Sequence, residues 1–309
     1  MTADVPLIDT HCHLDFAGNA AELAAAYAAC GGALSGTCDP RDFDRVCAIL
    51  APYAPRVRVG LGLHPWWVAD GTCGEGEAAL FERLAPAAPL ISEVGLDFQS
   101  RRADTRDEQI EAFERVCVAS ARPLGEGKAA GRSGDARRDA GSLQQHAVSS
   151  SSEAGRPGKV EPEPGSGQSA AGSPGEPPRR IMSIHSSAAA ACVLDVLERT
   201  GCLDACLCIF HWFSGSQEEL TRAIESGCLF SVNERMLKTK RGRAYARAIP
   251  KNRLLIETDF PSKPTAMTIS QDVAPRLERT MSLLAEARGA DERSLVAAIA
   301  STSERLLLS

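Results

Sequence analysis

This 309-residue sequence lacks an excess of positive charge. It has 34 lysines and arginines against 40 aspartates and glutamates, which gives a formal net charge of −6 and a pI near 5.6. A broad basic surface that neutralises many nucleic-acid phosphates is therefore excluded. Any phosphate that the protein binds must be held by local groups and not by its net charge.

The sequence also lacks a run of about 18 apolar residues, so no transmembrane helix is expected. Residues 1–6 lack the basic and then apolar pattern of a secretory signal. From these two features we expect a soluble, cytoplasmic protein without a membrane partner, and no feature predicts a protein partner.

Paired cysteines are absent as well. The eleven cysteines include no CxxC motif, and many lie in apolar runs, where reduced thiols behave as small hydrophobic side chains. This usage favours a reducing compartment. Cys206 and Cys208 are two residues apart on a predicted strand, so their side chains point to one face, and we interpret them as packing residues.

One long segment has almost none of the residues that build a core. Residues 125–178 contain eleven of the 26 glycines and six of the 18 prolines, but one leucine, two valines and no aromatic residue. Such a segment cannot bury enough apolar surface to offset its chain entropy, so we predict a low-complexity, disordered insertion. The chain is then one domain over 1–309 whose folded parts are 1–124 and 179–309.

Elsewhere, short apolar runs alternate with segments of helical period, which is typical of an α/β fold. Strands are predicted over 7–11, 33–38, 57–64, 90–98, 181–185, 206–213, 229–232 and 254–259. Helices are predicted over 19–29, 42–50, 107–121, 188–199, 216–226, 233–248, 270–287 and 291–307. Eight βα units in this length predict a (β/α)₈ TIM-like barrel. A doubly wound sheet is the competing fold, but the first strand is not followed by a glycine-rich phosphate loop.

Most of the histidines lie at or near the carboxyl ends of predicted strands. Five of the six do so, namely His11, His13, His64, His185 and His211, whereas His146 lies in the predicted insertion. Glu93 lies inside the fourth predicted strand, and Asp259 closes the eighth. Because strand ends converge at one mouth of a barrel, we expect these side chains to become neighbours there.

The chemistry of these residues indicates a metal site. His11 and His13 are two apart on a strand, so their imidazoles face the same side, and neutral imidazoles are good ligands for divalent cations. Glu93 lies in an otherwise apolar run, where a buried carboxylate is costly unless it is paired or binds a cation. Asp9 and Asp97 are interpreted as supporting groups that orient or cap neighbouring segments.

All three tryptophans lie at or just beyond strand ends. Trp66, Trp67 and Trp212 could wall a pocket and stack a base, or they could pack within the fold. The sequence leaves both interpretations open.

At these positions the sequence resembles the TatD-type metal-dependent deoxyribonucleases, a branch of the amidohydrolase-like TIM-barrel hydrolases. The resemblance covers nearly the whole chain outside the insertion. It rests on the segments DTHCHLD (9–15), GLHP (62–65), SEVGLDF (92–98), IHS (184–186), HWFSGS (211–216), LFSVNERML (229–237) and LLIETDFP (254–261).

The resemblance implies a site for two divalent cations, with Mg, Mn or Zn as the expected metals. Its ligands would be His11, His13, Glu93 and Asp259 for one ion, and Glu93, His185 and His211 for the other. The resemblance also implies catalytic roles for Glu93, Asp259 and His64. Asp259 would take the proton of the attacking water, and His64 would touch that water or the scissile phosphate.

The resemblance implies a hydrolase that cleaves phosphodiester bonds of DNA, as an exonuclease that trims ends. This sequence departs from the family around the substrate: it reads Ser186-Ser187 where an arginine is usual, residues 260–270 form a shortened stretch, and 301–308 lack the late asparagine. Two alternatives therefore stay open, a metal-dependent hydrolase of a small ester, amide or lactone, and a degenerate barrel that only binds.

Overall fold

The computed structural model describes residues 5–125, 179–265 and 267–308. The predicted insertion lies outside these residues except for Gly125, and so does His146. The prediction of disorder in the insertion is therefore not tested by the structure.

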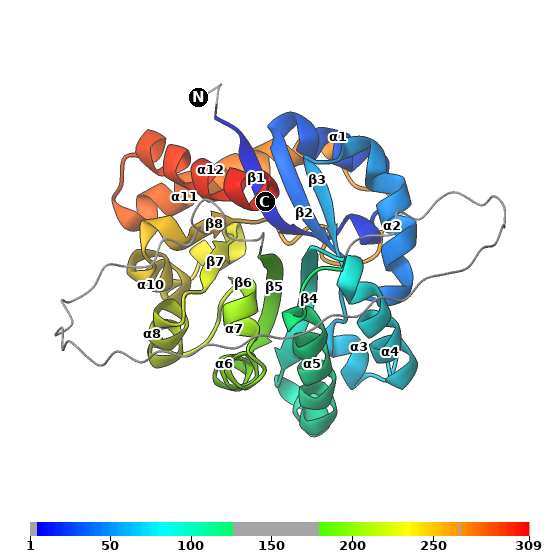
Figure 1. Cartoon of the computed structure of the whole chain (residues 1–309). Helices are drawn as coiled ribbons and strands as arrows, with labels where there is room; N and C mark the ends of the chain where they lie inside the picture. Colours follow the sequence, from blue (N-terminus) through cyan, green and yellow to red (C-terminus); the bar gives the residue numbers. More distant parts are fainter. Residues whose placement is uncertain (1–4, 126–178, 266, 309) are drawn as a thin grey trace, which may run out of the picture.

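All eight predicted strands are present, and neighbouring strands run parallel in sequence order (Figure 1). A three-stranded and a five-stranded sheet contain them. They are β1 (Leu7–Cys12), β2 (Gly31–Gly36), β3 (Val57–Gly60), β4 (Leu90–Asp97), β5 (Arg180–Ser187), β6 (Cys206–His211), β7 (Leu229–Val232) and β8 (Leu254–Ile256).

Backbone hydrogen bonds at two seams join the two sheets into the predicted barrel. Between β3 and β4, the Leu61 N–H donates to Leu90 O and the Ser92 N–H to Leu61 O, both at 3.0 Å. Between β1 and the segment after β8, the Asp259 N–H donates to His11 O at 3.0 Å. The second seam places two predicted metal ligands side by side.

Helices surround the strands on the outside (Figure 1). They are α1 (Ala20–Cys30), α2 (Phe43–Leu50), α3 (Pro65–Ala69), α4 (Glu75–Leu84), α5 (Arg106–Ala121), α6 (Ala190–Arg199), α7 (Cys202–Ala205), α8 (Gln217–Glu225), α9 (Glu234–Leu237), α10 (Lys240–Ala248), α11 (Val273–Arg288) and α12 (Glu292–Leu308). Short 3₁₀ turns are η1 (Leu14–Phe16), η2 (Pro40–Asp42), η3 (Ala51–Tyr53), η4 (Ala85–Ala87), η5 (Ser100–Thr105), η6 (Lys251–Arg253) and η7 (Ser270–Asp272). No helix in the described ranges is long and apolar enough to cross a membrane.

Three sequence predictions of element boundaries are wrong. The predicted helix over 233–248 is two helices, because the Thr239 side chain accepts from the Gly242 N–H and starts α10 as a new helix. The predicted strand over 57–64 ends at Gly60, and His64 already caps α3. The predicted strand over 254–259 ends at Ile256, so Asp259 does not close a strand.

An apolar layer fills the barrel near the amino ends of its strands. Seven strands each contribute one aliphatic side chain, and Leu306 and Leu307 of α12 cover them: Ile8, Leu34, Leu90, Ile181, Ile209, Leu229 and Leu255. On β3, the Arg58 guanidinium donates to the carbonyls of Leu306 and Leu307, at 3.0 and 3.1 Å. This end of the barrel is closed, which leaves the other end for a site.

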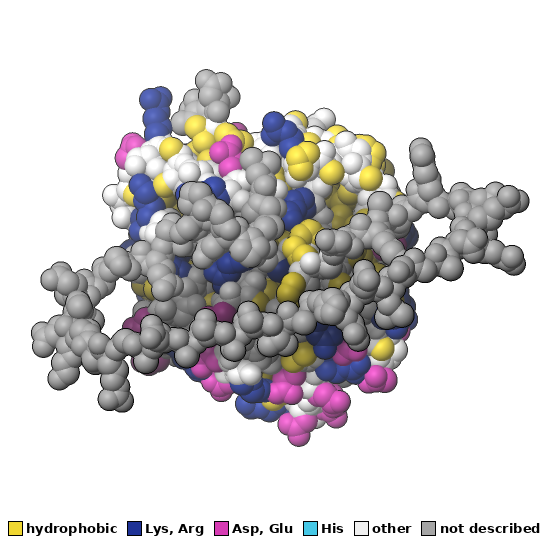
Figure 2. Space-filling model, in the orientation of Figure 1, with side chains coloured by type: hydrophobic (Ala, Val, Ile, Leu, Met, Phe, Trp, Pro, Cys, Tyr) yellow, Lys and Arg dark blue, Asp and Glu magenta, His cyan; other side chains and the backbone are white. Residues whose placement is uncertain are grey.

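The surface in the orientation of Figure 1 agrees with this arrangement. Figure 2 shows basic and acidic side chains scattered over the visible described surface, and no histidine can be seen there.

Candidate metal centre

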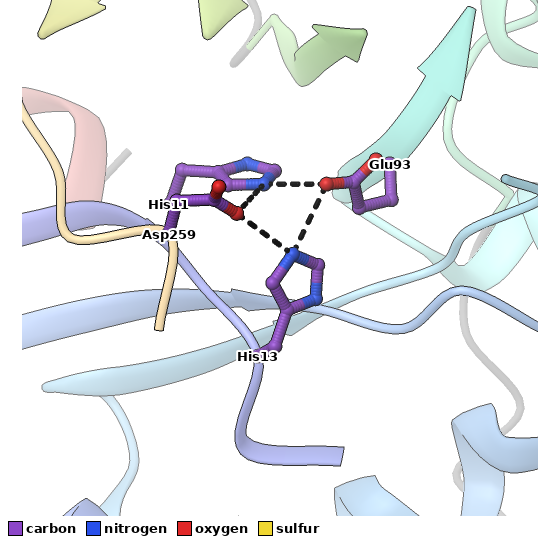
Figure 3. A group of neighbouring side chains, drawn as sticks. All are labelled: His11, His13, Glu93 and Asp259. Carbon is purple, nitrogen blue, oxygen red and sulfur yellow. Dashed lines mark hydrogen bonds and ion pairs between the residues drawn. The ribbon is translucent and has the colours of Figure 1, made fainter. Parts of the chain in front are cut away.

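Four predicted ligands converge at the carboxyl end of the barrel. His11 lies on β1, His13 follows that strand, Glu93 lies on β4 and Asp259 follows β8, and their side chains point toward one another (Figure 3). One ligand atom of each lies within 4.8 Å of the others. Glu93 Oε1 is 2.8 Å from His11 Nε2 and 3.1 Å from His13 Nε2, and Asp259 Oδ1 is 3.3 Å from His13 Nε2.

Irregular backbone aims these side chains into the barrel. The pairing register shifts between Asp9 and Cys12 on β1 and between Ile91 and Val94 on β4. Glu93 adopts a φ of 53°, a left-handed conformation that costs a non-glycine residue about 1–3 kcal/mol. Bulges and strained residues of this kind redirect side chains next to functional sites.

Asp259 has the same φ of 53°, and Asp9 holds the chain beside it. Asp9 Oδ1 accepts from the backbone N–H groups of His11 and Thr258, each at 3.1 Å, and Asp9 Oδ2 accepts from the Thr258 hydroxyl at 2.5 Å. Asp9 thus ties β1 to the segment after β8, which fixes His11 and Asp259 relative to each other.

A second group forms around the other oxygen of the Glu93 carboxylate. His64, Glu93 and His185 offer ligand atoms within 4.8 Å of one another, and His64 Nε2 lies 3.2 Å from Glu93 Oε2. His64 Nδ1 accepts from the Trp66 N–H at 3.0 Å, so its proton is on Nε2, toward the pocket. Glu93 therefore lies between both groups, as a bridging carboxylate must.

His211 lies beside both groups without belonging to either. Its ring stacks on that of His11, with centroids 3.9 Å apart, and its Nε2 is 3.6 Å from Glu93 Oε1. Both of its ring nitrogens are buried without a hydrogen-bond partner, as is Glu93 Oε2. Unpartnered buried polar atoms are costly, so their convergence indicates a ligand that these atoms hold.

The protonation states of the two carboxylates, His64 and His211 suit cation binding. Burial opposes ionisation of Glu93, but the surrounding imidazoles, first of all His64, bring its pKa well below the usual value. Burial lowers the pKa of His64 to about 3 and that of His211 well below its ordinary value. Burial also opposes ionisation of Asp259, yet the hydrogen bond from His13 lowers its pKa. Ionised carboxylates and neutral imidazoles are the forms that bind metals. Despite its burial, His13 has a pKa raised well above the ordinary value by Cys38, Asp15 and Asp259, so this imidazole would have to lose a proton to bind a metal.

The charge balance also fits cations. Among the described residues, no lysine or arginine lies within ion-pair distance of Glu93 or Asp259, and the ion-pair partners of both carboxylates are histidines. Two carboxylates in a buried cluster of imidazoles need positive charge from elsewhere. A mixed imidazole and carboxylate set is suited to Zn and Mn, and carboxylates also to Mg.

Two supporting groups orient the predicted ligands. The Ser183 hydroxyl lies 2.7 Å from His11 Nδ1, which leaves Nε2 of that ring to face the site. Sequence analysis missed Ser183, although it precedes His185 by two residues and thus shares its side of β5. Asp97 Oδ2 lies 3.1 Å from His185 Nε2 and accepts from Trp66 Nε1 at 2.5 Å, so it supports His185 as well as a pocket wall.

A pocket of about 520 Å³ opens over the two groups. Its lining includes five of the six predicted metal ligands and all three tryptophans. The tryptophans therefore wall the pocket, while Trp67 and Trp212 also pack against the hydrophobic core. His11 lies beneath it, fully buried. The lining is His13, Phe16, Cys38, His64, Trp66, Trp67, Glu93, Asp97, Gln99, His185, Ser186, Ser187, His211, Trp212, Ser214, Arg235, Asp259 and Ser262.

Solved structures share this fold over almost the whole chain. A TatD homologue from Escherichia coli K12 matches with a TM-score of 0.61 and 18% identity, over 98% of both chains. A TatD family hydrolase from Entamoeba histolytica matches with a TM-score of 0.65 and 13% identity, again over 98% of both chains. An uncharacterised amidohydrolase from Saccharomyces cerevisiae matches with a TM-score of 0.61 and 13% identity, over 98% of this chain and 99% of its own.

Sequence comparisons identify the family. A deoxyribonuclease Tat-D from Schizosaccharomyces pombe is 43% identical over 53 residues, which span 17% of this chain and 17% of that protein. The family model for TatD-related DNases matches residues 8–124 and 178–308, the two parts on either side of the predicted insertion. The chain therefore belongs to the family of TatD-related DNases.

Proposed function

We propose that this protein hydrolyses phosphodiester bonds of DNA with two divalent cations bound around Glu93, and that it trims DNA ends. The gathering of the other five predicted ligands around the buried carboxylate of Glu93 supports the proposal most strongly. Family membership supports DNA as the substrate.

We assign the first cation to His11, His13, Glu93 and Asp259, whose donor atoms already face one another. The second is assigned to Glu93, His185 and His211, with His64 next to it. His211 has two unpartnered ring nitrogens beside Glu93, and Asp97 holds His185 through Nε2, leaving Nδ1 as the other nitrogen that can bind an ion. Bound cations would supply Lewis acidity toward the phosphate and lower the pKa of a water.

The protein's own groups then have distinct tasks. Asp259 is ionised near neutral pH and lies at the pocket surface, so its carboxylate can accept the proton of the attacking water. His64 carries its proton on Nε2 and can donate a hydrogen bond to a phosphate oxygen.

The test combines metal analysis with DNA cleavage. Purified protein should contain a divalent metal and should cleave 5′- or 3′-labelled oligodeoxynucleotides from one end, and a chelator should abolish cleavage. Glu93→Gln and Asp259→Asn should each lower kcat/KM by about 100-fold or more and reduce bound metal. Glu225→Gln, at an exposed carboxylate on α8, is the matched control.

Two results would overturn the proposal. One is a metal-loaded protein that hydrolyses a small ester or lactone orders of magnitude faster than any DNA, which would select the alternative substrate class. The other is an absence of bound metal together with cleavage that is indifferent to both variants, which would favour a degenerate barrel.

A further inference from the structure

Arg235 brings an uncommitted positive charge to the pocket. It lies in α9, directly after β7, and lines both the main pocket and an adjoining cavity that also contains Asp259. Within the described part of the chain, no carboxylate lies within ion-pair distance of its guanidinium. Its neighbours are paired: Glu234 Oε1 lies 2.6 Å from Lys238 Nζ and 3.6 Å from Arg279 Nη1. Arg235 is thus free to bind an anion, and no other lysine or arginine is among the described residues that line the main pocket.

Trp212 presents an aromatic ring next to this charge. The Arg235 Cζ lies 5.8 Å from the centre of the Trp212 ring, within cation–π distance. Trp212 follows His211 directly and has a φ of 41°, which is strained for a bulky residue. The next residue, Phe213, is buried in the core. The strained turn therefore directs the Phe213 ring into the core and the Trp212 indole into the pocket.

Trp66, another of the three tryptophans that line the pocket, is already engaged. The Trp66 indole donates to Asp97, and the Arg102 guanidinium lies 4.0 Å from its ring centre, so a cation covers one of its faces. Arg102 is in turn 3.6 Å from Asp97 Oδ2, so its charge is paired. This contrast favours Trp212 and Arg235 over Trp66 and Arg102 as groups that bind substrate.

The positions of Arg235 and Trp212 in the fold suit them to bind a phosphate and a base. The residues after His185 are Ser186 and Ser187, which line the pocket and carry no charge. Arg235 places a guanidinium in the same pocket from the end of β7. A guanidinium binds phosphate through two parallel hydrogen bonds, and a flat indole stacks on any base.

We propose that Arg235 and Trp212 form a nucleotide-binding subsite beside the metal centre. Arg235 binds a phosphate next to the scissile one, and Trp212 stacks on the adjoining base. The inference rests on the proposed function, since it assigns part of the DNA to named residues.

The first test measures binding without catalysis. A fluorescent single-stranded oligodeoxynucleotide is titrated with protein in EDTA, and anisotropy gives Kd at several salt concentrations. Arg235→Gln should raise Kd about tenfold and reduce the salt slope by about 1. Trp212→Leu should raise Kd about tenfold, while Trp212→Phe should retain most of the binding because it keeps a flat ring. Arg293→Gln, at an exposed arginine on α12, is the matched control.

The second test uses chemically altered DNA with the metal-loaded protein. A neutral methylphosphonate at the phosphate next to the cleaved bond should raise KM for the wild type and leave Arg235→Gln unaffected. An abasic residue next to the cleaved bond should raise KM for the wild type and leave the KM of Trp212→Leu unchanged. Circular dichroism and thermal unfolding confirm that each variant is folded.

The outcomes separate this inference from the proposed function. If the wild type cleaves DNA in a Glu93-dependent way while Arg235→Gln and Trp212→Leu keep wild-type Kd and KM, the subsite alone is overturned. It is also overturned if the losses persist unchanged on the modified oligonucleotides. Wild-type protein that neither binds nor cleaves DNA overturns both the subsite and the proposed function.

Discussion

Glu93 shows how much a single buried side chain contributes to this site. Both of its oxygens face imidazoles, one side toward His11 and His13 and the other toward His64. It occupies a strained backbone conformation in the middle of a strand, which stability alone would not select. Its apolar sequence context predicted that this carboxylate is paired or binds a cation, because an unpartnered carboxylate would be costly there.

Asp39 gives a prediction at the residue scale that is independent of metals. Its carboxylate caps η2 and accepts from the Arg41 backbone N–H at 2.8 Å. Burial opposes its ionisation, but the hydrogen bonds from Arg41 outweigh this and lower the pKa of Asp39 below its ordinary value of 3.8. Asparagine can still cap η2 but cannot form the ion pair with Arg41, so Asp39→Asn should lower the free energy of unfolding at pH 7 by up to about 1 kcal/mol.

The pH dependence of that loss follows from the sign of the shift. A carboxyl whose pKa is lower in the folded state stabilises the fold above its unfolded pKa, and this contribution is lost as pH falls through the folded pKa. Urea unfolding at pH 7, 5, 4 and 3 should show the difference between wild type and variant shrinking as the pH falls below about 4. A difference that stays constant over this range would contradict the assignment.

Helices and strands begin and end at capping residues and backbone turns, and the pattern of apolar residues predicts these ends only in part. The last strand is three residues long instead of six, and the chain then takes a left-handed conformation at Asp259, which no apolar pattern reports. The predicted helix over 233–248 breaks where Thr239 caps a new helix. Sequence analysis also missed the short helix α3, although His64-Pro65 is a typical helix start.

Arg180 connects three elements around the start of β5. Its side chain is buried, and its guanidinium donates to four backbone carbonyls, on Ala85, Ala88, Ser120 and Arg122. These carbonyls lie at or near η4 and the end of α5. Arg180 therefore holds together the chain on both sides of residues 126–178.

Arg180→Leu should destabilise the fold by about 2–4 kcal/mol, because it removes charged hydrogen bonds and leaves buried carbonyls without a donor. Urea unfolding measures the loss. Activity per folded molecule should stay within about twofold, since the side chain lies at the closed end of the barrel. Arg83→Leu, at an exposed arginine on α4, is the control and should change stability by less than about 0.5 kcal/mol.

At the scale of the whole molecule, the pocket links folding to metal binding. Ligands that come from β1, β4, β5, β6 and the segment after β8 are assembled only in the folded state. An ion that binds the folded state should therefore stabilise it, by about 2.7 kcal/mol at 100 times its Kd.

For a chain of this size, that gain raises Tm by about 5–10 °C. Differential scanning calorimetry with added Mn²⁺ or Zn²⁺ should show the rise, and a chelator should reverse it. Glu93→Gln should lose most of it, while Glu225→Gln should keep it. An equal rise in Tm in both variants would mean that the stabilising ion binds outside the site around Glu93.

The barrel should also form without residues 126–178. The family model matches the chain on either side of this segment and omits it, and Arg180 Nη1 reaches Arg122 O across it at 2.9 Å. Replacing 126–178 by a flexible glycine-serine linker of about ten residues should leave kcat/KM within about twofold and Tm within a few degrees. A folded variant that no longer cleaves DNA would assign the segment a part in catalysis.

The sequence by itself determined the barrel, the number and order of its strands and the residue types that gather at strand ends. It could do so because hydrophobic periodicity is local, and because buried carboxylates and histidines are chemically conspicuous. The tertiary structure alone decided that His211 stacks on His11, that Ser183 and Asp97 hold imidazoles and that Arg235 lies beside Trp212 in the pocket. These contacts join residues far apart in the chain, and their geometry depends on bulges and left-handed residues that composition and periodicity do not encode.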